Sequence, residues 1–205
     1  MKKTLWSLWT KKIFNGILLL SLAWVVRELY EPVVSYVSGM NTLETFAGIS
    51  GWVNASILIV PALSLLIVTL IIIMIGCLLV VAGLKDVSGI LEEADRKPVA
   101  DLRVAFILLL VAAALQLVPL AGVISDVVSL AAAILMLSGY HRLEASPTFP
   151  GKDGASILSV AMILIIVGWV FDFIPLIGDW IESALVIVAY VLTVVGWHKI
   201  KNVTV

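Results

Sequence analysis

Long apolar stretches alternate with short polar segments along almost the whole chain. A helix needs about 20 residues, most of them apolar, to cross the hydrocarbon core of a bilayer. The stretches that meet this requirement are residues 13–31, 57–84, 104–121, 123–140, 156–174 and 177–197. We therefore predict an all-α fold, a polytopic transmembrane helical bundle of about six spans, in which residues 13–205 form a single transmembrane domain.

Two of the breaks between these stretches carry the same motif. Residues 119–122 read PLAG and residues 175–178 read PLIG. Each is followed at nearly the same distance by glycine, an aromatic, histidine and a basic residue: GYHR at 139–142 and GWHK at 196–199. A weaker first copy is expected at residues 61–83. Proline removes a helix hydrogen bond and glycine permits a chain reversal, so each copy is predicted to be a helical hairpin.

Because each hairpin crosses the membrane twice, all three copies enter it from the same side. The sequence thus predicts three hairpins related as parallel internal repeats. Many alternating-access transporters are instead built from inverted repeats.

Four segments outside the predicted spans have their own character. Residues 1–12 hold apolar and aromatic residues between lysine pairs, which predicts a separate interfacial anchor on an anionic membrane surface. Residues 32–56 are interrupted by glycine and proline and are expected to lie along the outer membrane surface. Residues 85–103 are expected to be a charged, partly amphipathic linker, and residues 143–155 a loop.

The first apolar run also resembles a secretory signal peptide. Lys11 and Lys12 precede it, and Ser21 to Ala23 could form a small-residue cleavage site. The apolar run continues past Ala23 to Val26. We therefore expect a retained first span.

The distribution of charge predicts the orientation. Of the 13 Lys and Arg residues, all except Arg27 fall on one side of the predicted topology, whereas acidic residues fall on both sides. Basic residues in short loops remain on the cytoplasmic side. The sequence predicts a multi-pass protein of the cell inner membrane with cytoplasmic N- and C-termini.

The composition limits the classes of function. Hydrophobic residues make up 62% of the chain and charged residues 13%, a composition that places the protein in a lipid bilayer. The net charge of −1 gives no reason to expect a nucleic-acid partner. Cys77 is the single cysteine and lies inside an apolar run, so a small buried side chain is expected there.

Four ionisable residues are the candidate functional residues, because they fall inside or at the ends of predicted spans. Arg27, Glu28 and Glu31 lie roughly 21–27 Å above Ile13 along a helix, where a charge is costly unless it is paired. Asp172 is a second possible buried carboxylate. We predict a salt bridge from Arg27, with Glu31 as the first candidate partner and Asp172 as the second. Snorkelling of Arg27 to the outer headgroups is the alternative.

Other polar residues have a structural and a functional interpretation. His141 and His198 could serve as ligands or proton carriers, but both follow an aromatic at a span end, where interfacial anchoring is the favoured interpretation. The acidic residues of the outer side could attract cations or could stabilise helix N-termini. They are Glu28, Glu31, Glu44, Asp126, Asp172, Asp179 and Glu182.

No catalytic, nucleotide-binding or metal-binding motif is found, so no enzyme activity, cofactor or metal is predicted. The repeated PLxG turn and Gly-aromatic-His-basic motif resemble those of uncharacterised small bacterial membrane proteins built from tandem helical hairpins. The resemblance covers about residues 57–200 and implies an architecture and a bacterial inner membrane, but no activity.

Two functions remain open, with an intramembrane enzyme behind both. The favoured one is a membrane-embedded assembly or partner-binding module, acting as a homo-oligomer or with a protein partner. Small residues suited to close helix packing support it, among them Gly76, Gly83 and Gly139. The alternative is a channel or small-solute transporter, against which the sparse polarity at midspan argues.

Overall fold

The structure, a computed structural model, describes most of the chain. The backbone is described for residues 2–46, 52–116, 118, 121–172, 174 and 178–203, and the side chains for the same set except 2–3, 27–46, 52–63, 66, 172 and 178–179. Within these residues the regular elements are the helices α1 Lys2–Phe46, α2 Trp52–Ser88, α3 Glu93–Leu115, α4 Gly122–Ala145, α5 Lys152–Asp172 and α6 Gly178–Asn202. All 6 are long and apolar enough to cross a membrane. The predicted all-α, six-span bundle is confirmed.

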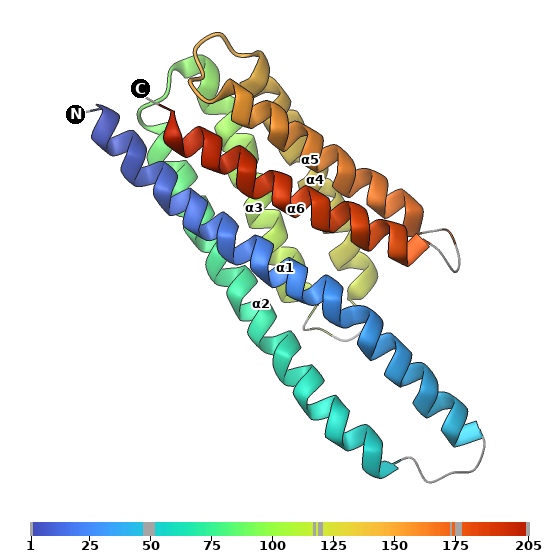
Figure 1. The fold of residues 1–205 in the computed structure, drawn as a ribbon. Coiled ribbons are helices and arrows are strands. Elements are labelled where there is room, and N and C mark those ends of the chain that lie inside the picture. Colours follow the sequence, from blue (N-terminus) through green and yellow to red (C-terminus); the bar gives the residue numbers. More distant parts are fainter. Residues whose placement is uncertain are drawn as a thin grey trace.

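The six helices form a closed ring (Figure 1). Each helix packs against its neighbours in the chain, and α1 packs against α6 to close the circle. The most extensive packing is within the pairs α1–α2, α3–α4 and α5–α6. Among the described residues no other two helices approach each other closely, so the ring surrounds a central space.

The bundle has two distinct ends. Both termini lie at one end together with the α2–α3 and α4–α5 connections; we call this the proximal end (Figure 1). The C-terminal ends of α1, α3 and α5 and the N-terminal ends of α2, α4 and α6 lie at the other, distal end. Helices α1 and α2 contain 45 and 37 residues and extend distally well past α3–α6, which contain between 21 and 25.

This extension corrects the prediction for residues 32–56. Instead of an interrupted surface segment, α1 continues to Phe46 and α2 already begins at Trp52. Pro61 likewise lies inside α2 and not at a turn. A single proline or glycine disfavours a helix by about 3 or 1 kcal/mol, which a long helix packed along a partner can tolerate.

The proximal segments are also more helical than predicted. Residues 85–103 are not a linker, because α2 runs through Ser88 and α3 begins at Glu93. The Lys, Arg and Glu residues among them are good helix formers, and Val99 and Leu102 are buried on one face of α3. The predicted loop at 143–155 shortens to residues 146–151. Residues 2–12, predicted as a separate anchor, continue directly into the first span as part of α1, and Trp6 is buried.

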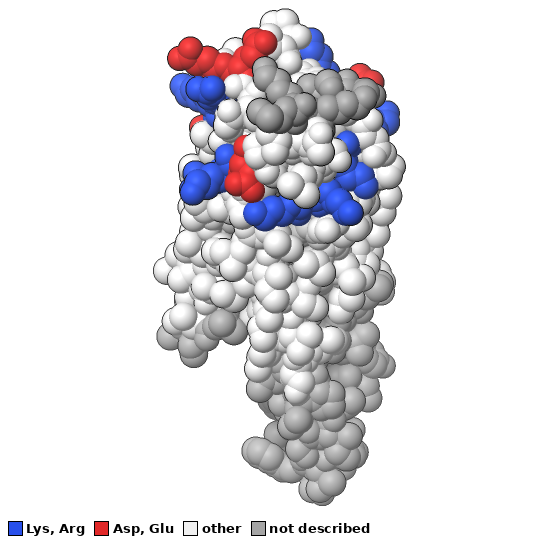
Figure 2. All heavy atoms as spheres, turned by 90° about the vertical axis from the view of Figure 1, so that its left-hand side faces the viewer, with Lys and Arg blue, Asp and Glu red and all other residues white. Residues whose placement is uncertain are grey.

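The surface is divided into a charged end and an apolar belt. Figure 2 shows Lys, Arg, Asp and Glu side chains gathered at the proximal end, above a band without charges. Large apolar side chains are exposed on the outside of the helices, including Ile71, Leu78, Val111, Val160 and Val191. A soluble monomer rarely exposes such a contiguous apolar surface, whereas a membrane protein presents it to lipid.

Three glycines, one in each helix pair, make close contacts with the preceding helix. A Cβ added to Gly83 of α2 would lie 2.5 Å from an Ile13 side-chain carbon and 3.3 Å from the carbonyl oxygen of Trp9. At Gly139 of α4 the corresponding neighbours are the side chain of Leu102 and the carbonyl oxygen of Pro98. At Gly196 of α6 they are the side chain of Leu158 and the carbonyl oxygen of Gly154. Each glycine thus contacts one side chain and the carbonyl oxygen four residues before it.

Candidate functional site

The side chains of the sequence-predicted candidates lie outside the described residues. Arg27, Glu28 and Glu31 fall within α1, and Asp172 is the last residue of α5. Their backbone positions alone do not establish an ion pair. The salt bridge from Arg27 therefore stays a prediction.

The two histidines lie at the proximal surface. The Nδ1 atom of His141 is 3.7 Å from a carboxylate oxygen of Glu144, one helical turn away. The Nε2 atom of His198 is 2.8 Å from the amide nitrogen of Asn202, and its ring lies 5.6 Å from that of Phe14. The described part of the chain contains no group of three His, Cys, Asp or Glu side chains placed to hold a metal ion. Each histidine has a local contact on its own helix.

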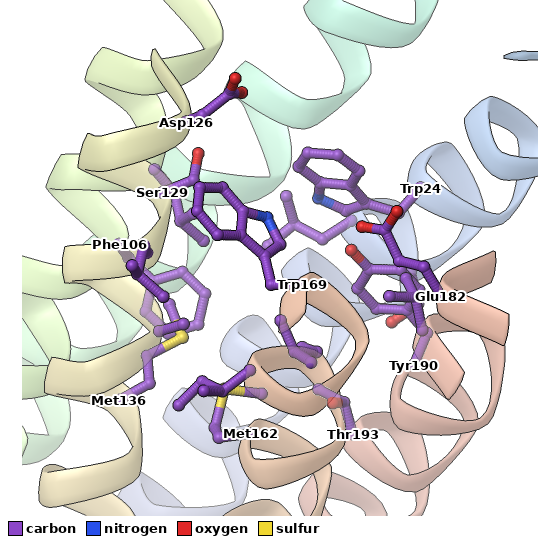
Figure 3. A pocket seen from close by; sticks show the side chains of 18 of the residues that line it. Trp24, Phe106, Asp126, Ser129, Met136, Met162, Trp169, Glu182, Tyr190 and Thr193 are labelled. Carbon is purple, nitrogen blue, oxygen red and sulfur yellow. The ribbon is translucent and has the colours of Figure 1, made fainter. Parts of the chain in front are cut away.

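The ring of helices encloses a cavity of about 590 Å³, which we call the central cavity (Figure 3). Its described lining residues come from five of the six helices, and none of them belongs to α2. Its residues reach from Gln116 and Asp126, near the distal ends of α3 and α4, to Tyr140 and Thr193 deeper in the bundle. The cavity is therefore a deep pocket that begins at the distal end. Its volume lies within the range of small-molecule pockets, about 300–1,000 Å³.

Polar and aromatic groups form the distal half of the central cavity. Asp126 of α4 is exposed, and Glu182 of α6 lies on the opposite wall in Figure 3. The rings of Trp24 and Tyr190 stack with centroids 6.0 Å apart and an interplanar angle of 15°. The indole of Trp169 lies between these groups in the same view. The distal half thus combines two carboxylates with three aromatic rings.

The deeper half of the cavity is apolar. Ile17 and Leu20 line it from α1, Phe106 from α3, and Met136 and Met162 from α4 and α5. These side chains are buried or partly buried and belong to the core of the bundle or pack against it. A ligand entering from the distal end would pass from charged and aromatic surroundings into apolar ones.

Tyr140 forms the floor of the cavity and is contacted by a second buried aromatic side chain, Trp197. The indole Nε1 of Trp197 donates a hydrogen bond to the Tyr140 hydroxyl oxygen at 3.3 Å. Their rings meet edge to face, with centroids 6.3 Å apart. Only 1% of Tyr140 and 4% of Trp197 is exposed. Both side chains therefore lie within the bundle and not on its outer surface.

A polar cluster of the buried Asp95 and Ser146 and the exposed Thr148 lies at the proximal end. Asp95, in the first turn of α3, is 0% exposed. The Ser146 hydroxyl donates to one of its carboxylate oxygens, and the Thr148 hydroxyl donates to the other at 2.8 Å. The cluster joins the start of α3 to the α4–α5 connection. Both carboxylate oxygens of Asp95 accept a hydrogen bond from within the chain, which indicates a structural role for the cluster.

The sequence pattern named Asp126 and Glu182 of the cavity among the acidic residues of the outer side, but it did not single out the aromatic residues that line the cavity. Trp24, Trp169 and Tyr190 stand within apolar runs where aromatic residues are common, and nothing in the pattern distinguishes them from lipid-facing positions. A helical spacing does connect Val186, Tyr190 and Thr193, which fall on one face of α6 and all line the cavity. This spacing can be interpreted only when the structure shows which face of α6 points towards the cavity.

Comparisons of the chain with protein-family models, with curated proteins and with solved structures found no match, so the central cavity rests on its own geometry.

Proposed function

We propose that this multi-pass membrane protein is a small-solute transporter that binds its solute in the central cavity. The observation that carries the proposal is the closed ring of helices around a deep pocket that begins at the distal end and has an aromatic floor. Such a pocket suits a carrier that admits a solute from one side at a time. An open channel would lack a floor, so the geometry favours a carrier over a channel.

The charge distribution supports an orientation for this carrier. The described Lys and Arg side chains lie at or near the proximal end, on helix segments next to the termini and the α2–α3 and α4–α5 connections. Basic residues in short loops stay on the cytoplasmic side. The proximal end is then cytoplasmic, the membrane is a bacterial inner membrane, and the cavity receives solute from outside.

The contacts within helix pairs support descent of the three pairs from one repeated hairpin. Gly83, Gly139 and Gly196 each lie against a side chain of the preceding helix and the carbonyl oxygen four residues before that side chain, a contact that Gly76 also makes with Leu20 and Gly16. The sequence separation between matching residues of the second and third pairs grows by one residue from Leu102 and Leu158 to Gly139 and Gly196. This agrees with the sequence, in which Gly196 follows Pro175 by one residue more than Gly139 follows Pro119. The prolines at 119 and 175 lie outside the described residues.

A pair of ion pairs supports the same relationship. Lys12 Nζ lies 3.1 Å from Asp86 Oδ2 in the first helix pair, and Arg142 Nη1 lies 3.0 Å from Asp101 Oδ2 in the second. Lys12 and Asp101 each precede the residue that contacts the glycine, and Asp86 and Arg142 each follow the glycine by three positions. The two ion pairs thus occupy matching positions, but the basic and the acidic residue are exchanged between them.

Cysteine accessibility tests the transporter proposal. In a Cys77→Ala background, Ser129→Cys places a thiol on the cavity wall, whereas Val160→Cys places one on the exposed apolar surface of α5. We expect a membrane-impermeant thiol reagent, added to intact cells, to modify position 129 and not position 160. A permeant maleimide should reach both. If position 129 reacts only from the cytoplasmic side or not at all, the cavity does not receive solute from outside.

Assembly remains the second candidate function. The observation in its favour is the distal extension of α1 and α2 beyond the rest of the bundle (Figure 1). Against it, the small residues expected to mediate assembly are used inside the chain: Gly76 packs on Gly16 and Leu20, and Gly139 packs on Leu102. The mass of the purified protein in nanodiscs tests assembly, because a monomer would remove this candidate in its self-associating form.

A further inference from the structure

The hydroxyl of Tyr140 carries an unused hydrogen-bond donor at the closed end of the central cavity. Its oxygen accepts the hydrogen bond from the Trp197 indole, and only 1% of the residue is exposed. A phenolic hydroxyl can donate a hydrogen bond as well as accept one. Within the part of the chain that the structure describes, it donates to no acceptor. A buried donor without an acceptor is unfavourable, so this position favours a ligand that supplies one.

Two other buried hydroxyls on the cavity walls also have hydrogen-bonding capacity left. Ser21 of α1 lines the cavity, is 7% exposed, and its hydroxyl makes no hydrogen bond to any described residue. Thr193 lies one helical turn from Trp197 on α6 and donates to the carbonyl oxygen of Ala189 at 2.8 Å. This bond leaves the Thr193 hydroxyl oxygen able to accept another. The cavity thus offers both a donor and an acceptor to a ligand that reaches its floor.

The walls around these hydroxyls are apolar. Ile17, Phe106, Met136 and Met162 line the deeper half of the cavity, and Figure 3 shows the two methionines together with Thr193 below Trp169. Pockets for small organic molecules combine apolar walls with a small number of polar groups that fix the orientation of the ligand. Methionine side chains adapt to the shape of an irregular ligand. The deeper half therefore suits an apolar ligand body with one oriented polar group.

The same walls disfavour a charged group near the floor. The two carboxylates that line the cavity, Asp126 and Glu182, belong to its distal half, and the described side chains of the deeper half include no Lys, Arg, His, Asp or Glu. An ion that reached Tyr140 would lose its hydration without a charged partner to replace it, which is costly. The part of the ligand that reaches the floor is therefore uncharged.

From these observations we infer that the deeper half of the central cavity binds an uncharged, apolar organic group whose carbonyl or hydroxyl oxygen accepts a hydrogen bond from Tyr140. The inference rests on the proposed function, because it names the solute class of the same cavity. It places no requirement on the distal half. A carrier for inorganic ions or for sugars would satisfy the proposed function and contradict this inference.

Two probes of nearly identical shape test the inference. Benzophenone and diphenylmethane both join two phenyl rings through one carbon atom, which is a carbonyl in the first and a methylene in the second. Their binding to the purified full-length protein in phosphatidylcholine nanodiscs is measured by equilibrium dialysis, with the uptake by empty nanodiscs subtracted. We expect the protein to bind benzophenone about fivefold or more tightly than diphenylmethane, the scale of one neutral hydrogen bond.

Matched variants assign this preference to the Tyr140 hydroxyl. Tyr140→Phe keeps the ring and should weaken benzophenone binding by about fivefold or more, while diphenylmethane binding stays unchanged. Ser159→Ala is the control, because it also removes a buried hydroxyl, one that donates to the carbonyl oxygen of Ala155 and is not among the described lining residues of the cavity. It should leave the binding of both probes unchanged.

Photochemical crosslinking locates the probe in the parent protein, without any substitution. On irradiation, the excited carbonyl of benzophenone takes a hydrogen atom from a nearby C–H bond, and its carbon then joins the carbon left behind. Met136 lies one helical turn from Tyr140 on α4, and Met162 faces the same deeper half from α5. We expect mass spectrometry of peptides to find the adduct on one of these two methionines.

The outcomes separate this inference from the proposed function. Absence of benzophenone binding, equal binding of the two probes, or unchanged benzophenone binding in Tyr140→Phe would overturn the inference. Adducts confined to exposed apolar residues of the outer surface, such as Val160, would overturn it as well. The accessibility of Ser129→Cys from outside is measured without either probe, so it decides the proposed function independently.

Discussion

The indole of Trp197 donates its hydrogen bond to the hydroxyl oxygen of Tyr140 across the interior of the ring, between two helices that are not neighbours in it. Both residues follow the glycine that packs against the preceding helix of its own pair. Adjacent residues on a helix point about 100° apart, so the side chain after each glycine turns away from the pair contact, and in both cases it is buried inside the bundle. The two copies of the motif thereby meet at the floor of the cavity.

The first prediction concerns this floor. Replacement Tyr140→Ala should remove enough of it to join the central cavity to the proximal surface. In inside-out vesicles carrying Cys77→Ala and Ser129→Cys, an impermeant thiol reagent should then reach position 129, which it should not do in the parent protein. Truncation of a buried aromatic costs about 3–5 kcal/mol, so folding is first verified by size-exclusion chromatography.

Two variants serve as controls for the floor. Tyr140→Phe keeps the ring, should lower the free energy of unfolding by about 0.5–1.5 kcal/mol through the lost hydrogen bond, and should leave position 129 protected. Trp180→Ala removes an aromatic of which 72% is exposed and should change nothing at position 129. Equal proximal reactivity in the parent and in Tyr140→Ala would show that these two rings do not close the cavity.

The second prediction concerns close contacts between helices. At Gly154 an added Cβ would lie 2.5 Å from the carbonyl oxygen of Gly196, a backbone atom that cannot move without shifting α6. Gly154→Ala should therefore separate α5 from α6 and lower the stability by roughly 1–3 kcal/mol or more, as overpacking does in a core. Thermal unfolding of the detergent-solubilised protein, followed by tryptophan fluorescence, measures the effect.

Gly122 provides the matched control, because a Cβ added there meets nothing within 4 Å. Gly122→Ala should leave the unfolding temperature unchanged or raise it slightly, since alanine is the better helix former. If Gly154→Ala is as stable as Gly122→Ala, the close approach of α5 and α6 is wrong.

The sequence predicted the fold class because the bilayer requires long apolar helices, and length and composition are readable residue by residue. It did not predict that α1 would continue to Phe46 or that α2 would pass through Pro61. Local helix breakers suggested turns there, whereas packing between two long helices outweighs the cost of a single proline or glycine. Tertiary contacts of that kind have no signature in a single sequence.

The candidate site was less predictable than the fold. Charged residues such as Arg27 and Asp172 attract attention because charge is costly in lipid. Trp169 and Tyr190 have no such signal, since an aromatic side chain suits lipid, core and cavity alike. Whether it lines a cavity depends on the rotation of its helix in the ring, which apolar helices without a polar face leave undetermined in the sequence.

The third prediction concerns the polar cluster of Asp95, Ser146 and Thr148 at the proximal end. Thr148→Val removes one of the two hydroxyl donors to Asp95 while keeping the size of the side chain, and leaves a fully buried carboxylate oxygen without its donor. We expect a loss of about 1–3 kcal/mol in the free energy of unfolding. Thr148→Ser keeps the hydroxyl and should be close to the parent protein, so equal unfolding temperatures for the two variants would contradict a tie through this hydrogen bond.

The fourth prediction concerns orientation. In the Cys77→Ala background, cysteines at Ser38 or Thr42 of α1 should react with an impermeant reagent in intact cells, and a cysteine at Ser88 should react only after the membrane is opened. Ser146 lies in the α4–α5 loop but is unsuitable for labelling. Only 9% of it is exposed, and its hydroxyl donates a hydrogen bond to Asp95. Asp153→Cys, at an exposed position, replaces it. The reverse labelling pattern would place the termini outside.

The fifth prediction follows from the two ion pairs of opposite sign. If Lys12–Asp86 and Asp101–Arg142 occupy corresponding positions in repeated hairpins, the first pair should tolerate exchange of its charges, because the second pair already has that arrangement. Lys12→Asp alone places two carboxylates beside each other, and Asp86→Lys alone places two ammonium groups there. Each single variant should lose up to about 1 kcal/mol, the scale of exposed ion pairs.

The double variant Lys12→Asp with Asp86→Lys should recover the stability of the parent protein. Mutations at independent sites add to within about 0.5 kcal/mol, so a larger deviation from the sum of the two single losses shows that the two residues are coupled. Thermal unfolding of the four proteins of this cycle gives the coupling energy between the two positions. The exchange keeps the number of basic residues at the proximal end, so it should leave the orientation unchanged, and the cysteine labelling described above verifies that. If the two single losses simply add in the double variant, the residues are not coupled, and the correspondence between the first two helix pairs loses its electrostatic support.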